Sequence, residues 1–375
     1  MSGDVITEYL QDRVDRGDFP SAVYLVAEKG EIVFHEAIGH AVVEPEKIAA
    51  KKDTIYDLAS LTKPLVMGLL GAQQIEDGDI RLESRIGDEH IVFTGPSAPA
   101  LTVKDLATHT SGLPAWLPLY LIAESTTNRD VGAVISECDL TGKGSNVEYS
   151  DLNFVALAIV IEEGRPDFEF EIGAAKELGL LRTAFNPISK GFERRDIAAS
   201  ERGNAYENQT CRELGYWPPA NSTGSQPFRD YQIWGEVHDG NAYFMGGGAG
   251  HAGLFSTAEE VFKISLQFLP KYTTLLKPET TKLFHTNFTK GMNEDRSFSF
   301  QLASTKNSTA GTKMSPESFG HNGFTGTSLW IDPIKDRVFI LLTNRTHNRQ
   351  LPFTNINGVR RRFHELAIEA LDAKK

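Results

Sequence analysis

Ser60 and Lys63, in the segment SLTKPL of residues 60–65, are the first residues of this sequence whose types and spacing suggest chemistry. A serine hydroxyl is a poor nucleophile until a base takes its proton, and a lysine can be that base once burial and nearby charge lower its pKa. Three positions apart on a helix, the two groups lie on one face and can meet. Ser-x-x-Lys also occurs often by chance. Without partner residues elsewhere, Ser60 is only a helix cap and Lys63 a solvated side chain.

The surrounding residues are compatible with a helix that begins near Ser60. Pro64 falls in its first turn, where a missing N–H costs little. Leu61, Leu65 and Leu69 then form an apolar stripe. The sequence therefore predicts that the pair stands at the start of a helix.

Strand patterns lie at both ends of the chain. Residues 21–39 read as a β-hairpin with its turn at Lys29 and Gly30, and residues 327–344 repeat the pattern around DPIKD. Apolar residues recur at helical spacing in the C-terminal segment 356–375, and in residues 65–78, 101–110, 151–164 and 257–270. We expect an antiparallel sheet lobe from residues 1–58 and 300–375, a mostly helical lobe from residues 59–299, and the active site in the cleft between them.

Two further motifs supply partners for the serine and lysine. VEYSDLNF, residues 147–154, places Tyr149 just before a helical pattern, and FGHNGFTGTSLWIDP, residues 319–333, places a glycine-containing turn beside a predicted strand. The order Ser-x-x-Lys, Tyr-x-Asn and Lys-x-Gly is that of the penicillin-recognising serine hydrolases. From about residue 5 to its end, the chain resembles their branch of class C β-lactamases, D,D-peptidases and related carboxylesterases. Residues 101–114, 246–261 and 320–333 look like recurrent segments of that family in the family's order.

The resemblance implies an α+β fold of the β-lactamase/transpeptidase-like type, with a five-stranded antiparallel sheet flanked by terminal helices and a mostly helical lobe. It implies that Ser60 is acylated, that Lys63 accepts or relays its proton, and that Tyr149 shuttles protons to the leaving group and later helps to activate water. The backbone N–H groups of Ser60 and Phe324 would form the oxyanion hole. A glycine at position 323 would leave the substrate free to approach the strand.

Two positions depart from the family's pattern. Asp151 stands where asparagine is common, and His321 stands where a lysine often helps to hold the substrate carboxylate. A histidine, with an unperturbed pKa of about 6.5, is a weaker anchor at neutral pH. With Asp151, His321, Asn322 and Gly323 at the substrate-binding edge, we expect a site that lacks this permanent positive charge and prefers neutral short-chain esters to β-lactams. Alternatively, Asp151 is neutralised by a salt bridge to Lys63, and its loss would damage catalysis generally.

Composition and charge argue against other classes of protein. The chain has 375 residues and a net charge of −12, whereas a nucleic-acid partner requires a basic face. Cys138 and Cys211 have no CxxC spacing, so we expect isolated thiols. The glycine run at 246–250 lacks the Gly-Lys-Ser/Thr ending of a phosphate loop and is expected to pack closely near the cleft, with His109 and His251 in structural roles.

The sequence suggests no metal centre and no cofactor. HEAIGH, residues 35–40, has the wrong spacing for a zinc helix, and the Gly-x-Ser-x-Gly elbow of α/β-hydrolases is absent. The first residues do not resemble a signal peptide, and no apolar run approaches the roughly 18 residues of a membrane span. We therefore expect a cytoplasmic protein without a membrane span, the alternative being an exported one whose leader is missing from the sequence.

These residues predict a serine hydrolase that forms an acyl-enzyme with a small-molecule ester, amide or peptide-like substrate, foremost a carboxylesterase. One alternative is a β-lactamase or D,D-peptidase acting on cell-wall-like substrates. Another is a penicillin-binding sensor that is acylated but hardly turns over. Ser60, Lys63 and Tyr149 together favour an enzyme, because a binding protein has no need of a proton-transfer pair.

Overall fold

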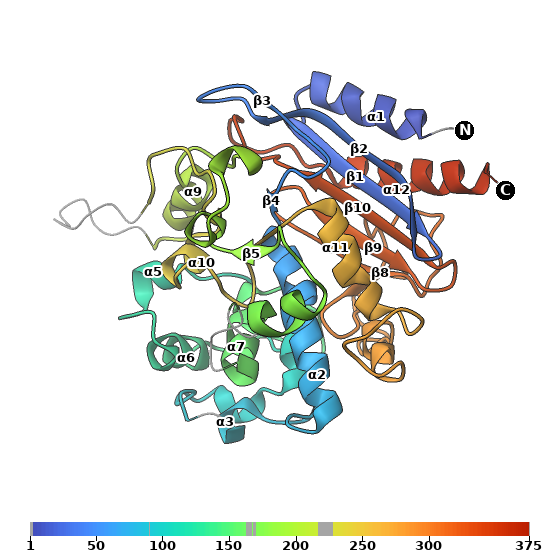
Figure 1. The fold of residues 1–375 in the computed structure, drawn as a ribbon. Helices are drawn as coiled ribbons and strands as arrows, with labels where there is room; N and C mark the ends of the chain where they lie inside the picture. Colours follow the sequence, from blue (N-terminus) through green and yellow to red (C-terminus); the bar gives the residue numbers. More distant parts are fainter. Residues whose placement is uncertain (1–2, 90, 163–166, 168–169, 217–227, 375) are drawn as a thin grey trace.

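A seven-stranded antiparallel sheet dominates one side of the molecule in the computed structural model, which describes residues 3–89, 91–162, 167, 170–216 and 228–374. Its strand order is β3-β2-β1-β10-β9-β8-β7, so that the two ends of the chain meet where β1 pairs with β10 (Figure 1). The strands are β1 (Ser21–Glu28), β2 (Glu31–Val42), β3 (Ile48–Ala49), β7 (Gln301–Leu302), β8 (Phe319–Asn322), β9 (Ser328–Asp332) and β10 (Arg337–Thr343). The five expected strands are present as β2, β1, β10, β9 and β8, and two-residue strands extend both edges.

The predicted hairpins are confirmed. Lys29 and Gly30 connect β1 to β2 with φ values of 57° and 81°, as a tight turn between twisted strands requires. The second hairpin pairs Asp332 of β9 with Arg337 of β10. A separate three-stranded sheet has the order β4-β6-β5, formed by Tyr56–Asp57, Leu254–Ser256 and Ala184–Phe185.

Both faces of the large sheet are covered, which explains why its central strands are almost entirely apolar. Successive side chains of a strand point to opposite faces. On β1, Val23 and Leu25 belong to the core that faces the helical part of the chain, whereas Tyr24 and Val26 belong to the core beneath the terminal helices. On β10, Ile340 and Leu341 divide in the same way.

The terminal helices α1 and α12 pack against each other over one face of the sheet (Figure 1). Helix α11, from within residues 59–299, packs against β1 and β10. No helix within the described residues is long and apolar enough to cross a membrane. The helices are α1 (Asp4–Asp15), α2 (Leu69–Asp77), α3 (Ile86–Glu89), α4 (Val103–Ala107), α5 (Leu119–Ile122), α6 (Asn128–Ser136), α7 (Asp151–Glu162), α9 (Ala205–Glu213), α10 (Gly240–Phe244), α11 (Ala258–Ser265) and α12 (Asn357–Asp372).

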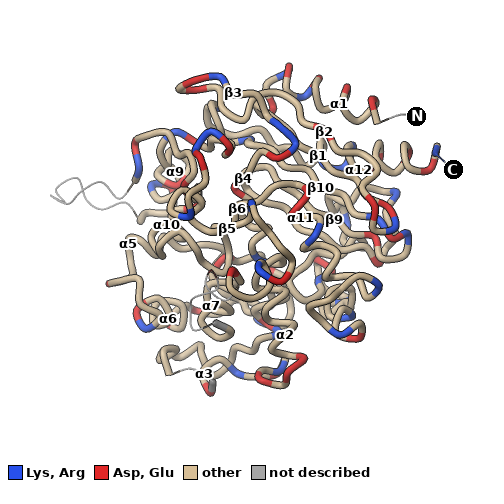
Figure 2. Tube along the Cα trace, in the orientation of Figure 1, with Lys and Arg blue, Asp and Glu red and all other residues tan. Residues whose placement is uncertain are grey.

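Acidic and basic residues are interspersed along the described part of the trace (Figure 2). Both cysteines are free thiols, as expected, and Cys211 is buried. The division of the chain into two lobes stays a prediction.

Candidate active site

A strained bend presents Ser60. After β4, residues Ala59–Leu61 form a 3₁₀ turn, and a π-helical stretch, Lys63–Gly68, then leads into α2. Ala59 has a φ of 48°, in the left-handed region that a non-glycine residue rarely adopts. The buried Asp57 carboxylate holds this bend, because it accepts hydrogen bonds from the Ala59 N–H at 2.8 Å and the His238 N–H at 2.7 Å. The predicted helix start near Ser60 is therefore present, in an irregular form.

Lys63 lies beneath Ser60 with its ammonium group fully enclosed. Its Nζ lies 2.9 Å from Ser60 Oγ, 2.7 Å from Asp151 Oδ1 and 3.1 Å from the carbonyl oxygen of His251. Burial alone would lower the pKa of Lys63, but the Asp151 carboxylate and the Tyr149 side chain more than offset this, and the net pKa is raised. Lys63 and Asp151 thus form a salt bridge at 2.7 Å, the alternative state of Asp151 named above.

Tyr149 closes the other side of Ser60, just before α7. The Lys63 Nζ lies 5.0 Å from the centre of its ring. Burial raises the pKa of Tyr149, and interactions with Lys63 and Ser60 offset part of that rise. The ring of His109 packs 4.5 Å away, and its Nδ1 accepts a hydrogen bond from the Ser150 N–H, so His109 has the buried, structural position expected for it.

Near His321, where the family often has a lysine, the structure places a permanent cation, Arg296. His321 is buried, and burial followed by the charge of Arg296 holds its pKa well below the usual range. The Arg296 guanidinium carbon lies 5.6 Å from the centre of the Tyr149 ring, on which the His321 ring also packs, at 5.8 Å. One Arg296 nitrogen pairs with Glu294 at 2.5 Å, while its Nε and Nη1 are buried without a partner among the described residues. Arg296 belongs to no motif, so no signal in the sequence pointed to it.

The third motif, His321 to Phe324, lines the cavity next to Tyr149. The Asn322 side chain donates a hydrogen bond to Thr309 Oγ1 at 2.9 Å, which fixes its orientation. A Cβ atom on Gly323 would lie 2.0 Å from Thr327 Oγ1 and 2.5 Å from the Leu58 carbonyl oxygen. Internal packing rather than substrate access therefore explains this glycine. Among the described residues, neither the Ser60 N–H nor the Phe324 N–H has a hydrogen-bond acceptor.

The site residues predicted from the sequence line one cavity of about 930 Å³, except Lys63, which is buried and contacts Ser60. Sequence reasoning missed much of its lining, which comes from loops and helices far from the motifs. The described lining residues include Ser60, Tyr149, Asp151, His321, Asn322, Gly323 and Phe324 together with Trp116, Leu117, Tyr206, Glu207, His238, Asp239, Arg296, Arg345 and Arg360.

Asp151, Asp239 and His251 form the group that most resembles a metal site, because their ligand atoms lie within 4.8 Å of one another. Within this group His251 Nε2 bonds to Asp239 at 2.8 Å, and Asp151 pairs with Lys63 from outside it, whereas His251 Nδ1 is buried without a partner among the described residues. Burial alone would lower the pKa of His251, but the Asp239 carboxylate outweighs this effect, and the net pKa is raised. The ammonium group of Lys63, bonded to Asp151 at 2.7 Å, opposes the binding of a metal cation at this group. The glycine run beside it packs closely, since a Cβ on Gly250 would lie 2.1 Å from the Phe154 carbonyl oxygen.

Comparisons with known proteins match almost the whole chain. A family model described as Beta-lactamase matches residues 6–359. A protein of Escherichia coli (strain K12) named putative D-alanyl-D-alanine carboxypeptidase is 29% identical over 367 residues, which cover 91% of this chain and 81% of the relative. The D-amino acid amidase from Ochrobactrum anthropi SV3 superposes with a TM-score of 0.71 at 17% identity and full coverage of both chains. The hydrolase EstCE1, with promiscuous acyltransferase activity, has a TM-score of 0.68 at 19% identity, covering 96% of this chain and 98% of its own.

Proposed function

This chain belongs to the Beta-lactamase family of serine hydrolases, and we propose that it cleaves an amide or ester bond adjacent to a free carboxylate, as a carboxypeptidase does on a short peptide ending in a D-amino acid. The single observation that carries this choice is Arg296. Its guanidinium is a permanent cation in the cavity lining, close to Tyr149 and His321, and its charge can attract a substrate carboxylate, although Nη2 is paired with Glu294 and Nε and Nη1 are buried. The name of the Escherichia coli relative points to the same substrate class.

In the proposed mechanism, Ser60 Oγ attacks the substrate carbonyl and loses its proton to the Lys63–Tyr149 pair. Lys63 Nζ donates a hydrogen bond to Ser60 Oγ at 2.9 Å, so the amine is within reach of the hydroxyl proton once Lys63 has lost a proton of its own. Because the pKa of Lys63 is raised, the pair must first lose a proton, and the rate should increase as the pH rises. Tyr149 then protonates the leaving group, and water attacks the acyl-Ser60 ester in the second half of the reaction.

The tetrahedral intermediate requires donors for its oxyanion. The N–H groups of Ser60 and Phe324 have no acceptor of their own within the described residues, which supports this role. Each such donor is worth roughly 3 kcal/mol in acyl transfer.

A carboxylesterase is the second candidate. The cavity is wide, and aromatic and apolar side chains such as Trp116, Leu117 and Tyr206 line it, which favours neutral acyl groups. The two candidates differ in whether turnover depends on a carboxylate next to the scissile bond.

The nucleophile is tested by covalent labelling. Ser60→Ala should abolish labelling by a fluorophosphonate and by penicillin, together with nearly all hydrolysis, while the circular dichroism spectrum is retained. Labelling that persists on another serine would remove Ser60 from the mechanism.

The substrate class is tested with three compounds: an N-acylated D-Ala-D-Ala peptide, its C-terminal amide and a short p-nitrophenyl ester. We expect the free carboxylate to be preferred, and Arg296→Met to reduce kcat/KM for it by about tenfold or more, with little effect on the amide. Lys290→Met, at an exposed position outside the cavity lining, is the control. Equal turnover of acid and amide, or turnover of the ester alone, would favour the esterase.

A further inference from the structure

Arg360, near the start of α12, contacts the backbone of the turn that follows β8. Its Nη2 donates hydrogen bonds to the carbonyl oxygen of Gly323 at 2.7 Å and to that of Thr327 at 2.9 Å, and its Nη1 donates to Asn357 at 2.9 Å. The side chain is 5% exposed and lies in the lining of the cavity. It therefore connects the terminal helix to the wall of the active site.

The Gly323 carbonyl and the Phe324 N–H belong to the same peptide unit. In a planar trans peptide, these two groups point in opposite directions. A guanidinium that is hydrogen-bonded to the Gly323 carbonyl oxygen thus fixes the direction in which the Phe324 N–H points. Because hydrogen bonds polarise one another along a chain, a charged donor on the carbonyl also makes that N–H a stronger donor.

The charge of Arg360 is not cancelled locally. None of the described residues offers it a carboxylate partner at salt-bridge distance. Burial, and then repulsion from Arg345, lowers the pKa of Arg360 to about 9, which leaves it charged at neutral pH. A buried cation in the first turn of a helix is unfavourable for stability, because the helix dipole is positive there. Folding stability alone therefore does not account for this arginine.

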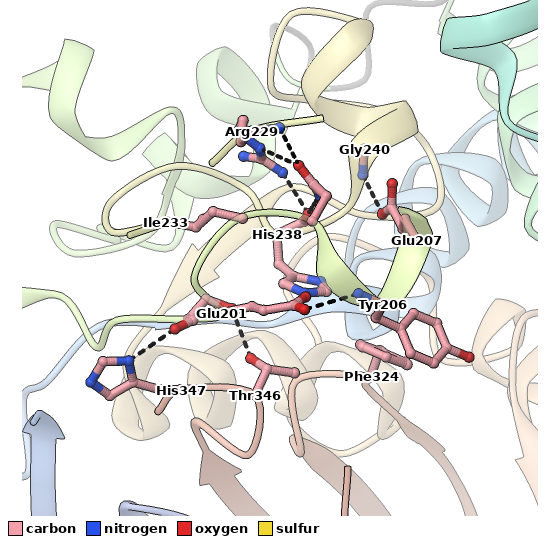
Figure 3. A network of polar contacts seen from close by, with 12 residues as sticks. Glu201, Tyr206, Glu207, Arg229, Ile233, His238, Gly240, Phe324, Thr346 and His347 are labelled. Atoms are coloured by element: carbon pink, nitrogen blue, oxygen red, sulfur yellow. Dashed lines mark hydrogen bonds and ion pairs between the residues drawn. The ribbon is translucent and has the colours of Figure 1, made fainter. Parts of the chain in front are cut away.

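Phe324 is held on its other sides as well. Arg345 donates to the Phe324 carbonyl through Nε at 3.1 Å and Nη2 at 2.6 Å. The ring of Phe324 packs between Tyr206, at 4.8 Å, and His238, at 5.4 Å, and Figure 3 shows these three side chains side by side. His238 is itself fixed by a buried contact of 2.7 Å with Glu201. The residue that carries the free N–H is thus immobilised through its carbonyl and its ring.

We infer that Arg360 is a positioning residue of the oxyanion hole, which aims and polarises the Phe324 N–H through the Gly323 carbonyl. The inference rests on the proposed function, since it needs an acyl-enzyme on Ser60. It assigns no direct substrate contact to Arg360.

The fold does not need Arg360 to satisfy these carbonyls. The Gly323 carbonyl also accepts from the Gly326 N–H at 3.1 Å, and the Thr327 carbonyl accepts from the Gly323 N–H at 2.8 Å. Arg360→Met should therefore fold, and Arg360→Lys keeps the charge and one donor. Arg361→Met is a matched control, because the neighbouring arginine also binds backbone carbonyls, those of Asn307 and Ser308, outside the cavity lining.

The experiment measures the carbonyl stretching band of the acyl-enzyme by infrared difference spectroscopy, with a slowly hydrolysed ester labelled with ¹³C at the carbonyl. A weaker oxyanion hole polarises the acyl carbonyl less and moves its band to higher frequency. We expect this shift in Arg360→Met, a smaller one in Arg360→Lys, and none in Arg361→Met. The acylation rate should fall by about tenfold or more in Arg360→Met while KM changes little.

An unchanged band and rate in Arg360→Met would overturn the inference alone. Should Arg360→Met not fold, an unchanged band and rate in Arg360→Lys would overturn it in the same way. The absence of any Ser60-dependent acyl band in the unsubstituted protein would overturn the proposed function, and this inference with it.

Discussion

Lys63 and Asp151 form a buried ion pair at 2.7 Å, with the lysine side chain fully enclosed and the aspartate side chain 19% exposed. The lysine amine lies between this carboxylate and the Ser60 hydroxyl. Asp151 therefore engages the catalytic candidate itself, and its charge is not left free to repel an anionic substrate.

Asp151→Asn should impair all substrates alike. Without the carboxylate, the pKa of Lys63 falls, so the rising limb of the pH profile of kcat/KM moves to lower pH. The maximal rate should fall roughly tenfold or more for ester and peptide, because the amine loses its anchor. Asp139→Asn, at an exposed position, is the control. A changed ratio of ester to peptide turnover, with the maximal rates preserved, would contradict this prediction.

Lys63→Ala and Tyr149→Phe should each lower kcat by at least about 100-fold, the usual scale for losing a positioned acid or base. Stopped-flow acylation and steady-state turnover measure the two halves of the reaction separately. Tyr243→Phe removes a hydroxyl outside the cavity lining and should leave both rates unchanged. Near-normal rates in either of the first two variants would exclude that residue from proton transfer.

Gly323→Ala should destabilise the protein and reduce its activity together. The new methyl group would meet Thr327 Oγ1 and the Leu58 carbonyl, which belongs to backbone just before Ser60. Overpacking of this kind costs about 1–3 kcal/mol, measurable as a reduced free energy of unfolding in urea. Gly358→Ala provides the comparison, because its Cβ would have no neighbour within 4 Å and the position is helical. Equal free energies of unfolding for the two variants would show that the turn after β8 relaxes to accommodate the methyl group, contrary to this prediction.

The Asp239–His251 pair should make stability depend on pH. Asp239 raises the pKa of the buried His251, with Asp151 acting in the same direction and Lys63 opposing it. A group whose pKa is raised on folding contributes its full stability below its unfolded pKa, about 6.5, and loses it as the pH rises through the folded value. The stability difference between the unsubstituted protein and His251→Asn should therefore shrink as the pH increases above about 6.5. Urea unfolding at several pH values measures it, and a constant difference would show that His251 does not titrate in this way.

Local patterns in the sequence were sufficient for much of the fold. The turn at Lys29 and Gly30 and the helix of residues 357–372 follow from periodicity and turn chemistry within short windows. Ser60 and Lys63 meet for the same reason, since residues three apart on helical backbone share a face. Tyr149 entered the prediction through the family resemblance, and the structure brings it to the same cavity.

The sequence by itself thus determined the main strands and helices and the meeting of Ser60 with Lys63, whereas tertiary structure decided the electrostatics of the site. Arg296 reaches Tyr149, Asp239 reaches His251 and Arg360 reaches Gly323, 37 residues away, from segments without a motif of their own. The charge-based expectation at position 321 did not include Arg296, because it considered only the charges of the motif residues themselves. Coulombic interactions and burial depend on distance in space, and only the packing of the terminal helix and the loops against the sheet edge sets those distances.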